Sequence, residues 1–205
     1  MDLIFCLRQN IRYYGLPGTI GLAPSSLPWP TAKVSNKTHT SLTDPDASLA
    51  FKAGTPGGLK YKIHLSVDAD SRVILAIQAT TGACHDSQPY LNQLNTIEHR
   101  YQLSIKETTA DRAYGSAEII EALVTKGIHP YIPLFNTRSG SFVPQETEGI
   151  IYESKHRHGL KRARYRGLVK VQIQALMGAS VQNIKRIVNF LLFIFYCENI
   201  LISHS

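Results

Sequence analysis

Acidic residues are missing from much of the C-terminal part of this 205-residue chain, since no Asp or Glu occurs between Ser154 and Cys197. The same stretch contains nine lysines and arginines, whereas the rest of the chain has 13 cations against 15 anions and is close to neutral. The formal net charge of +7 therefore comes from one segment. Such a concentration of positive charge predicts a polyanionic partner such as nucleic acid.

Cysteine and long apolar runs are also scarce. The three cysteines are far apart and form no CxxC pair, which argues against a disulfide framework or zinc knuckle and fits a reducing cytosol. They are Cys6, Cys84 and Cys197. The apolar stretch 187–202 is interrupted by Asn189, Glu198 and Asn199, so it falls short of the roughly 20 residues of a membrane span. We expect a cytoplasmic protein without membrane contact, in which this stretch is a buried helix end.

The hydrophobic pattern predicts a mixed α/β domain after an irregular stretch at residues 15–33. Residues 59–67 alternate strictly between apolar and polar side chains, the pattern of a half-buried strand, and a turn at 68–71 joins them to a second strand at 72–79. The elements expected next are a helix capped by Asp86 or Ser87 and ending near Tyr101, a strand at 104–110, a helix from Ser116 to Gly127, a strand at 128–133, a helix at 145–158 and a long helix from about 168. The long helix has apolar residues at helical spacing: Val169, Ile173, Leu176, Ile184, Ile187 and Leu191.

Two acidic residues are candidates for catalysis. Asp111 follows the predicted strand 104–110, and a carboxylate at this end of a strand faces the ligand crevice of an open α/β sheet. An Asp at such a position can also simply cap the turn that follows. Position alone does not favour either interpretation. In a helix, Glu148 shares a face with Tyr152 and Lys155, so an acid able to hold a metal lies near a cation able to hold a phosphate. An ordinary solvated helix has the same pattern. Paired carboxylates suit Mg²⁺-dependent phosphodiester chemistry, which usually draws on three.

The stretch KHRHGLKRARYRG (155–167) is the candidate nucleic-acid-binding segment. Arg162, Arg164 and Arg166 alternate with Ala163 and Tyr165, and guanidinium groups suit phosphate oxygens. A solvated basic face is the alternative. The residues expected to contact DNA are Lys155, His158, Lys161, Arg162, Arg164 and Arg166.

Several stretches, taken together and in order, resemble the DDE transposases of bacterial insertion sequences, whose catalytic core is ribonuclease H-like. The stretches are SLTDPDAS (41–48), LKYKIHLSVD (59–68), GACHDS (82–87), TADRAYGSAE (109–118), GIHPYIP (127–133) and the long run from 148 to 187. The resemblance implies an α/β fold with a ribonuclease H-like mixed sheet flanked by helices and a basic C-terminal helical segment. It implies a domain at 41–195, after a non-matching segment at 1–40 and before a tail at 196–205.

The resemblance also implies roles for individual residues. Asp111 and Glu148 correspond to the second and third catalytic carboxylates, which would hold Mg²⁺ or Mn²⁺, and Lys155 would contact DNA near the cleaved bond. Asp44 and Asp46 take structural positions. The implied partners are double-stranded DNA, as transposon ends and target, and another copy or a full-length transposase at the bacterial nucleoid.

One catalytic position has no counterpart. The first aspartate of the family lies on the first core strand, upstream of SLTDPDAS, and residues 22–36 contain no acid. We therefore expect an N-terminally truncated copy whose first core strand is missing, although residues 2–8 (DLIFCLR) are apolar enough to replace it. The candidate functions are Mg²⁺-dependent DNA cleavage and strand transfer in a degenerate transposase, non-catalytic binding of transposon ends or of a full-length transposase, and no function at all.

Overall fold

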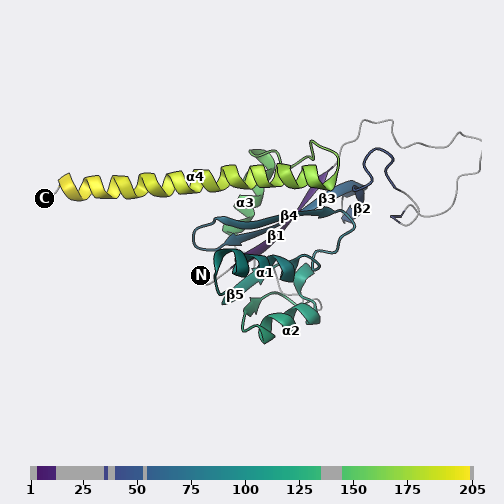
Figure 1. Cartoon of the computed structure of the whole chain (residues 1–205), viewed down its shortest axis with the longest axis horizontal. Helices are drawn as coiled ribbons and strands as arrows, with labels where there is room; N and C mark the ends of the chain where they lie inside the picture. Colours follow the sequence, from purple (N-terminus) through teal and green to yellow (C-terminus); the bar gives the residue numbers. More distant parts are fainter. Residues whose placement is uncertain (1–3, 13–34, 37–39, 53–54, 135–144, 204–205) are drawn as a thin grey trace, which may run out of the picture.

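The computed structural model describes residues 4–12, 35–36, 40–52, 55–134 and 145–203. They form a mixed six-stranded sheet with α3 and α4 on one face and α1 and α2 on the other (Figure 1). The strands are β1 (Ile4–Arg12), β2 (Ser48–Lys52), β3 (Thr55–Asp68), β4 (Ile74–Thr81), β5 (Glu107–Ala110) and β6 (His129–Tyr131). The helices are α1 (Tyr90–Tyr101), η1 (Arg112–Tyr114), α2 (Ala117–Thr125), α3 (Gln145–His156) and α4 (Leu168–Ser203).

The sheet is organised around β1 and β3. β3 pairs antiparallel with β1 along one edge and with β2 and β4 along the other, while β5 and then β6 continue the sheet in parallel beyond β1. A first strand between an antiparallel hairpin and parallel strands is the arrangement of a ribonuclease H-like sheet. The predicted α/β fold class is confirmed.

β1 corrects the expectation that the first core strand is missing. It pairs with β3 from Ile4 opposite Asp68 to Arg12 opposite Lys60, and its first residues pair with β5. An empty position here would leave two rows of backbone groups unpaired in the middle of the sheet. Residues 4–8 of the segment DLIFCLR lie in this strand, so the alternative that the segment supplies it holds for its described residues, and residues 1–40 are not irregular throughout. The irregular stretch predicted at 15–33 lies outside the described residues.

The polar face of β3 is buried, contrary to the prediction of a half-buried strand. Its apolar face packs against α3 and α4 through Tyr61, Ile63, Leu65 and Val67. On the other face, His64 Nε2 lies 2.9 Å from Thr80 Oγ1, and Ser66 Oγ donates to Gln93 Oε1 of α1 at 3.1 Å. Hydrogen bonds satisfy the polar side chains on this face beneath α1. Apolar and polar residues alternate along β3 because its two faces lie in different buried environments, not because one face is exposed to solvent.

α4 lies along β4 and protects its open edge. Gln172 Oε1 accepts a hydrogen bond from the Ala79 amide at 2.6 Å, and Asn183 exchanges two bonds of 2.9 Å with the backbone of Ile74. The two side chains are separated by about 16 Å along the helix, and five strand residues span about the same length. This match lets one helix cover an edge that would otherwise be open to pairing with another strand.

Asp44 and Asp46 fix the start of α4. Asp46 Oδ2 accepts from the Leu168 amide at 2.8 Å, and Asp44 Oδ1 accepts from the Gly167 amide at 3.1 Å and from the Tyr61 hydroxyl at 2.6 Å. Burial and the neighbouring Asp44 carboxylate raise the pKa of Tyr61 above its ordinary value, so its hydroxyl remains a donor. Both carboxylates satisfy amides at a helix N-terminus, which is a structural role, as the sequence predicts.

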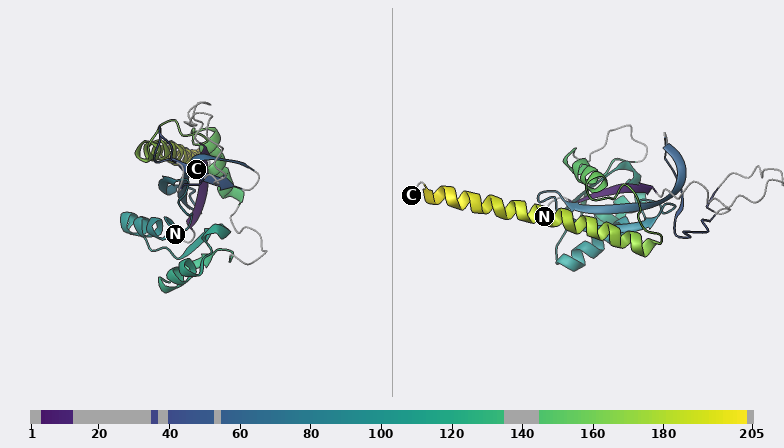
Figure 2. Two further views of the ribbon diagram at one scale, coloured as in Figure 1. Left: turned by 90° about the vertical axis from the view of Figure 1, so that its right-hand side faces the viewer. Right: turned by 90° about the horizontal axis from the view of Figure 1, so that it is seen from above.

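The C-terminal half of α4 extends beyond the sheet, away from the rest of the described protein (Figures 1 and 2). Phe190, Phe193 and Phe195 are 63–66% exposed, so the prediction of a buried helix end is wrong. α4 also continues without interruption through residue 196, where a tail was expected to begin. In the described part of the chain, no helix is both long and apolar enough to cross a membrane.

Candidate functional site

Asp111 lies at the carboxyl end of β5, as the sequence predicts. Its backbone is extended (φ −73°, ψ 169°), and Oδ1 accepts a hydrogen bond of 2.9 Å from the Ala113 amide at the start of η1. The residue is partly exposed. Asp111 thus does cap the turn, which was the structural interpretation. The same bond orients the carboxylate at the end of a parallel strand, so the two interpretations are compatible.

Glu148 lies in the first half of α3, close to the predicted helix 145–158. Its side chain falls outside the described residues, whereas Tyr152 is exposed and Lys155 is partly buried. α3 contacts β1, and β1 pairs with β5 on its other side from β3. The strand that precedes Asp111 and the helix that contains Glu148 therefore meet at the same central strand.

This arrangement does not complete a metal site. Two-metal phosphodiester chemistry rests on several carboxylate oxygens, and β1 (IFCLRQNIR), the strand beside Asp111, contains no Asp or Glu. Among the described residues, no group of three His, Cys, Asp or Glu side chains is placed to hold a metal ion. The side chains that the structure describes therefore do not make up the expected set of three carboxylates, and no metal-dependent step follows from them.

The predicted DNA-contacting residues concentrate in the loop between α3 and α4. Leu160 and Ala163 are buried in the core and anchor this loop to the body. Tyr165 and four cations around these anchors are exposed, and the cations are Lys161, Arg162, Arg164 and Arg166. The structure therefore presents these cations together on one surface loop, hereafter the basic loop (157–167).

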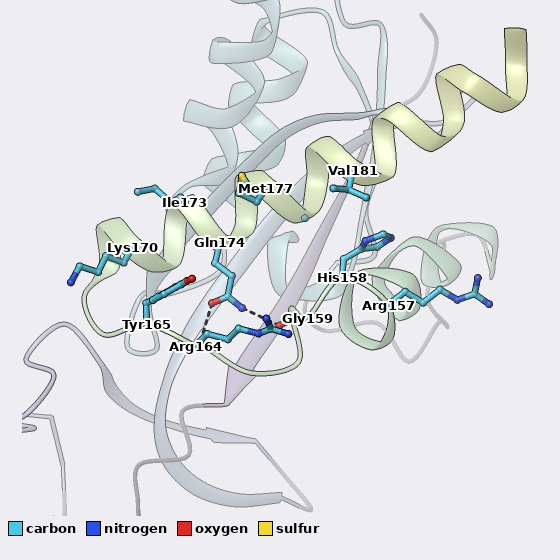
Figure 3. Close-up of a pocket in the computed structure, with 11 residues that line it drawn as sticks. Arg157, His158, Gly159, Arg164, Tyr165, Lys170, Ile173, Gln174, Met177 and Val181 are labelled. Carbon is cyan, nitrogen blue, oxygen red and sulfur yellow. Dashed lines mark hydrogen bonds between the residues drawn. The ribbon is translucent and has the colours of Figure 1, made fainter.

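Gln174 of α4 fixes the conformation of the basic loop (Figure 3). Its Oε1 accepts from the Arg164 amide at 2.9 Å, and its Nε2 donates to the carbonyls of Gly159 and Arg162 at 3.0 and 2.8 Å. Gly159 has φ +72°, a left-handed conformation that favours glycine. One buried amide thus binds three backbone groups of the loop. No local sequence pattern indicates this role, because the partners lie in another element.

Glu153 joins α3 to α4 and to the loop between them through three side chains. Its carboxylate lies 2.7 Å from Lys185 Nζ, 3.3 Å from Arg186 Nη2 and 3.2 Å from His158 Nε2. Burial opposes ionisation of Glu153, but hydrogen bonds from Lys185 and His158 and the charges of Lys185 and Arg186 outweigh it, so its pKa is lowered. His158, which the sequence predicts to contact DNA, is thus positioned by Glu153.

A pocket of 710 Å³ lies beside this contact and is lined by residues of both the basic loop and α4. One part of its lining is cationic, with Arg157, Arg164 and Lys170, and another is apolar. The apolar lining includes Ile173, Met177 and Val181 of α4 (Figure 3). Arg157 and Lys170 were not singled out as DNA-contacting residues, although both belong to the run of nine cations that the sequence shows.

Comparisons with known proteins agree with the resemblance seen in the sequence. A search of curated proteins found no match. Among solved structures, a crystal structure of the Mos1 mariner paired end complex with Mn is similar, with 9% sequence identity and a TM-score of 0.44. That match covers 91% of this chain and 55% of the other, so this chain spans little more than half the length of that relative. Residues 37–169 match the transposase DDE domain, and since this is more than half of the chain, the protein belongs to the transposase DDE domain family.

Proposed function

We propose that this protein binds double-stranded DNA in transposition, at the bacterial nucleoid, and that alone it has little or no Mg²⁺- or Mn²⁺-dependent cleavage and strand-transfer activity. The observation that supports the second part is the sequence of β1. This strand occupies the central position beside β5, yet its nine residues include no carboxylate. Asp111 and Glu148 would then be two members of an incomplete set.

The basic loop supports DNA binding. Lys161, Arg162, Arg164 and Arg166 are exposed together with Lys170 at the start of α4. Five phosphate contacts release counterions, so the logarithm of the affinity would fall with the logarithm of the salt concentration at a slope of about −4.5. Such contacts position DNA without reading its sequence, so they suit both transposon ends and target DNA.

Fluorescence anisotropy with a labelled 30-base-pair duplex of random sequence tests the binding surface. Arg162→Ala, Arg164→Ala and Arg166→Ala should each weaken binding several-fold and reduce the salt slope by about one. Arg100→Ala is the matched control, because Arg100 is exposed on α1 at the opposite face of the sheet. Equal losses for Arg100→Ala and the loop variants would mean that only net charge attracts DNA and would contradict the assignment.

Cleavage is tested separately, with duplexes carrying the ends of the protein's own element and 5 mM MgCl₂ or MnCl₂, metal concentrations on the order of those usual for weakly held Mg²⁺. We expect no cleavage above the background of the Asp111→Ala and Glu148→Ala variants, and unchanged DNA affinity for both. Metal-dependent cutting that either substitution abolishes would show that the chain is a working transposase and would refute the proposed deficiency.

A further inference from the structure

A second pocket, of 470 Å³, is lined by residues of α3, of α4 and of the turn that joins β3 to β4. Its lining contains four cations and one acid, so the charge of the lining is +3 when the acid is ionised. The cations are Arg72, Arg157, Lys185 and Arg186, and the acid is Glu153. None of the residues that the sequence predicts to contact DNA lines this pocket. Its volume lies in the range of about 300–1,000 Å³ that is usual for small-molecule sites.

Arg72 lies at the pocket in a backbone conformation that favours glycine. Two hydrogen bonds close the turn between β3 and β4: the Asp68 amide donates to the Val73 carbonyl at 2.9 Å, and the Arg72 amide donates to the Asp68 carbonyl at 3.0 Å. At the end of this turn Arg72 has φ +59°, in the left-handed region. A side chain there strains the backbone, and such strain is concentrated at functional sites. The chain therefore presents a guanidinium where glycine would fit more easily.

The cations of this pocket are held close to one another. Lys185 and Arg186 both contact Glu153, at 2.7 and 3.3 Å. Burial and the nearby charge of Arg72 lower the pKa of Arg186 in spite of Glu153. One carboxylate thus leaves like charges facing each other, and a bound anion would remove this repulsion. A guanidinium has five N–H donors, so Arg186 can bind Glu153 and a phosphate group at the same time.

Gln182 indicates that the ligand also carries a hydrogen-bond donor. Its side chain is fully buried and forms part of the pocket lining. Its Nε2 donates to Ser154 Oγ at 2.7 Å, whereas its Oε1 has no hydrogen-bond partner within the described part of the chain. Buried acceptors are normally satisfied by the protein, by water or by a ligand. A fully deprotonated phosphate cannot donate, so an N–H or O–H group has to accompany the anion.

We propose that this pocket binds a mononucleotide, whose phosphates contact Arg72, Lys185 and Arg186 and whose base lies on Tyr152. Tyr152 lines the pocket, is 61% exposed and stacks against His156 with ring centroids 4.1 Å apart. An exposed aromatic ring beside a cationic cluster suits a base joined to phosphates. The hydroxyl groups of the ribose and the amino group of a base supply the donor for Gln182. A pocket of this volume holds one nucleotide, whereas duplex DNA would contact only its rim.

Isothermal titration calorimetry on the purified full chain, with ATP as the probe, EDTA present and DNA absent, tests this site. We expect saturable binding of ATP. Arg72→Gly should raise the dissociation constant roughly 10- to 100-fold, through loss of a charge-assisted contact to phosphate. This variant should fold as stably as the wild type, because glycine is favoured at φ +59°. Tripolyphosphate should bind about 10-fold more weakly than ATP, because it lacks the stacked base.

Two substitutions on α1 and at its end, on the opposite face of the sheet, are the matched controls. Arg100→Ala removes one exposed cation, and Gln102→Gly relieves a left-handed residue (φ +52°) without loss of charge. Both variants should bind ATP like the wild type. Absence of ATP binding would overturn the proposal, as would equal losses for Arg72→Gly and Arg100→Ala, or tripolyphosphate binding as tightly as ATP.

Duplex DNA is the competing ligand for this cationic surface. Arg72→Gly should leave the affinity for the labelled random duplex unchanged, because the basic loop is intact in this variant. A loss of duplex affinity as large as the loss of ATP affinity would show that the pocket is part of the DNA-binding surface and would refute a nucleotide site. The nucleotide site does not rest on the proposed function, since ATP binding is measured without DNA.

Discussion

Replacing Glu153 by Gln should destabilise the protein through loss of the connection between α3 and α4. The carboxylate side chain is only 22% exposed and has three hydrogen-bonding partners, of which Arg186 (18% exposed) and His158 (10%) are the most buried. A hydrogen bond to a charged group is worth about 1.5–3 kcal/mol, whereas the half-exposed Lys185 contributes only a few tenths. Burial lowers the pKa of Arg186 in spite of Glu153, which offsets part of the gain. We expect a net loss of about 2 kcal/mol.

The dependence on pH identifies the cause of this loss. Since the pKa of Glu153 is lower in the folded protein, the ion-pair contribution is fully present above the pKa of the unfolded chain, about 4.3, and is lost as the pH falls through the folded value. Urea unfolding at pH 7 should therefore separate wild type from Glu153→Gln by about 2 kcal/mol, or roughly 4–8 °C in Tm. The difference should shrink below about pH 4.

Glu121→Gln is the control for this measurement, because Glu121 is exposed on α2 and its loss changes the net charge equally. Its free energy of unfolding should stay within about 0.5 kcal/mol of wild type. A difference between wild type and Glu153→Gln that is the same at pH 7 and in acid would refute the electrostatic explanation. It would indicate that the substitution disturbs packing instead.

Further changes test other contacts by urea unfolding. Gly82→Ala should lower the free energy of unfolding by about 2–4 kcal/mol, because a Cβ there would lie 2.6 Å from the Lys60 carbonyl oxygen. Gly58→Ala, where a Cβ would have nothing within 4 Å, should lower it by less than about 1 kcal/mol. Equal losses of stability in the two variants would contradict the steric argument. Asp46→Ala should cost about 1 kcal/mol through the uncapped start of α4, and an unchanged stability would show that water replaces the cap. Asn183→Leu leaves the Ile74 backbone groups unpaired and should cost about 1–3 kcal/mol; aggregation after heating would report the exposed edge of β4.

Elements defined by their own residues were predictable. The hairpin of β3 and β4 follows from alternation, and α2 begins at Ser116, whose hydroxyl accepts a hydrogen bond from the Ile119 amide. Gly127 ends the same helix with φ +73°, as a glycine stop signal predicts. In each case the interactions that specify the element lie within a few residues of sequence, so a local pattern contains the information.

Features that depend on distant partners were not predictable. β1 has no strict alternation, and its place is specified by β3 and β5, which lie 50 to 100 residues further along the chain. Asp86 was expected to cap α1, but the helix has Pro89 at its N-cap without a side-chain hydrogen bond, and Asp86 lies 3.1 Å from Lys62 of β3 instead. A partly buried lysine on a strand attracts the nearest carboxylate more strongly than exposed helix amides do.

The residues of the candidate site also differ in whether a local sequence pattern indicates them. Asp111 was located because a strand end followed by a turn is a local signal, and the exposed arginines because their alternation with Ala163 and Tyr165 is one. Gln174 and Glu153 were missed, since an isolated Gln or Glu on a helix has no sequence signal until its partners are known. Both position the basic loop or the helices beside it, so the proposed DNA-binding surface rests on residues that composition does not reveal.

α4 shows why periodicity alone cannot say which face of a helix is buried. The series from Val169 to Leu191 was recognised in the sequence, and an amphipathic helix normally turns such a face toward its own core. Here the sheet instead takes the face with Ala175 and Ala179, whose small side chains let the helix approach β4 closely enough for Gln172 and Asn183 to reach its backbone. The bulkier residues are consequently left outward. A helix that packs its small residues on the sheet thus leaves large apolar residues exposed at coiled-coil spacing.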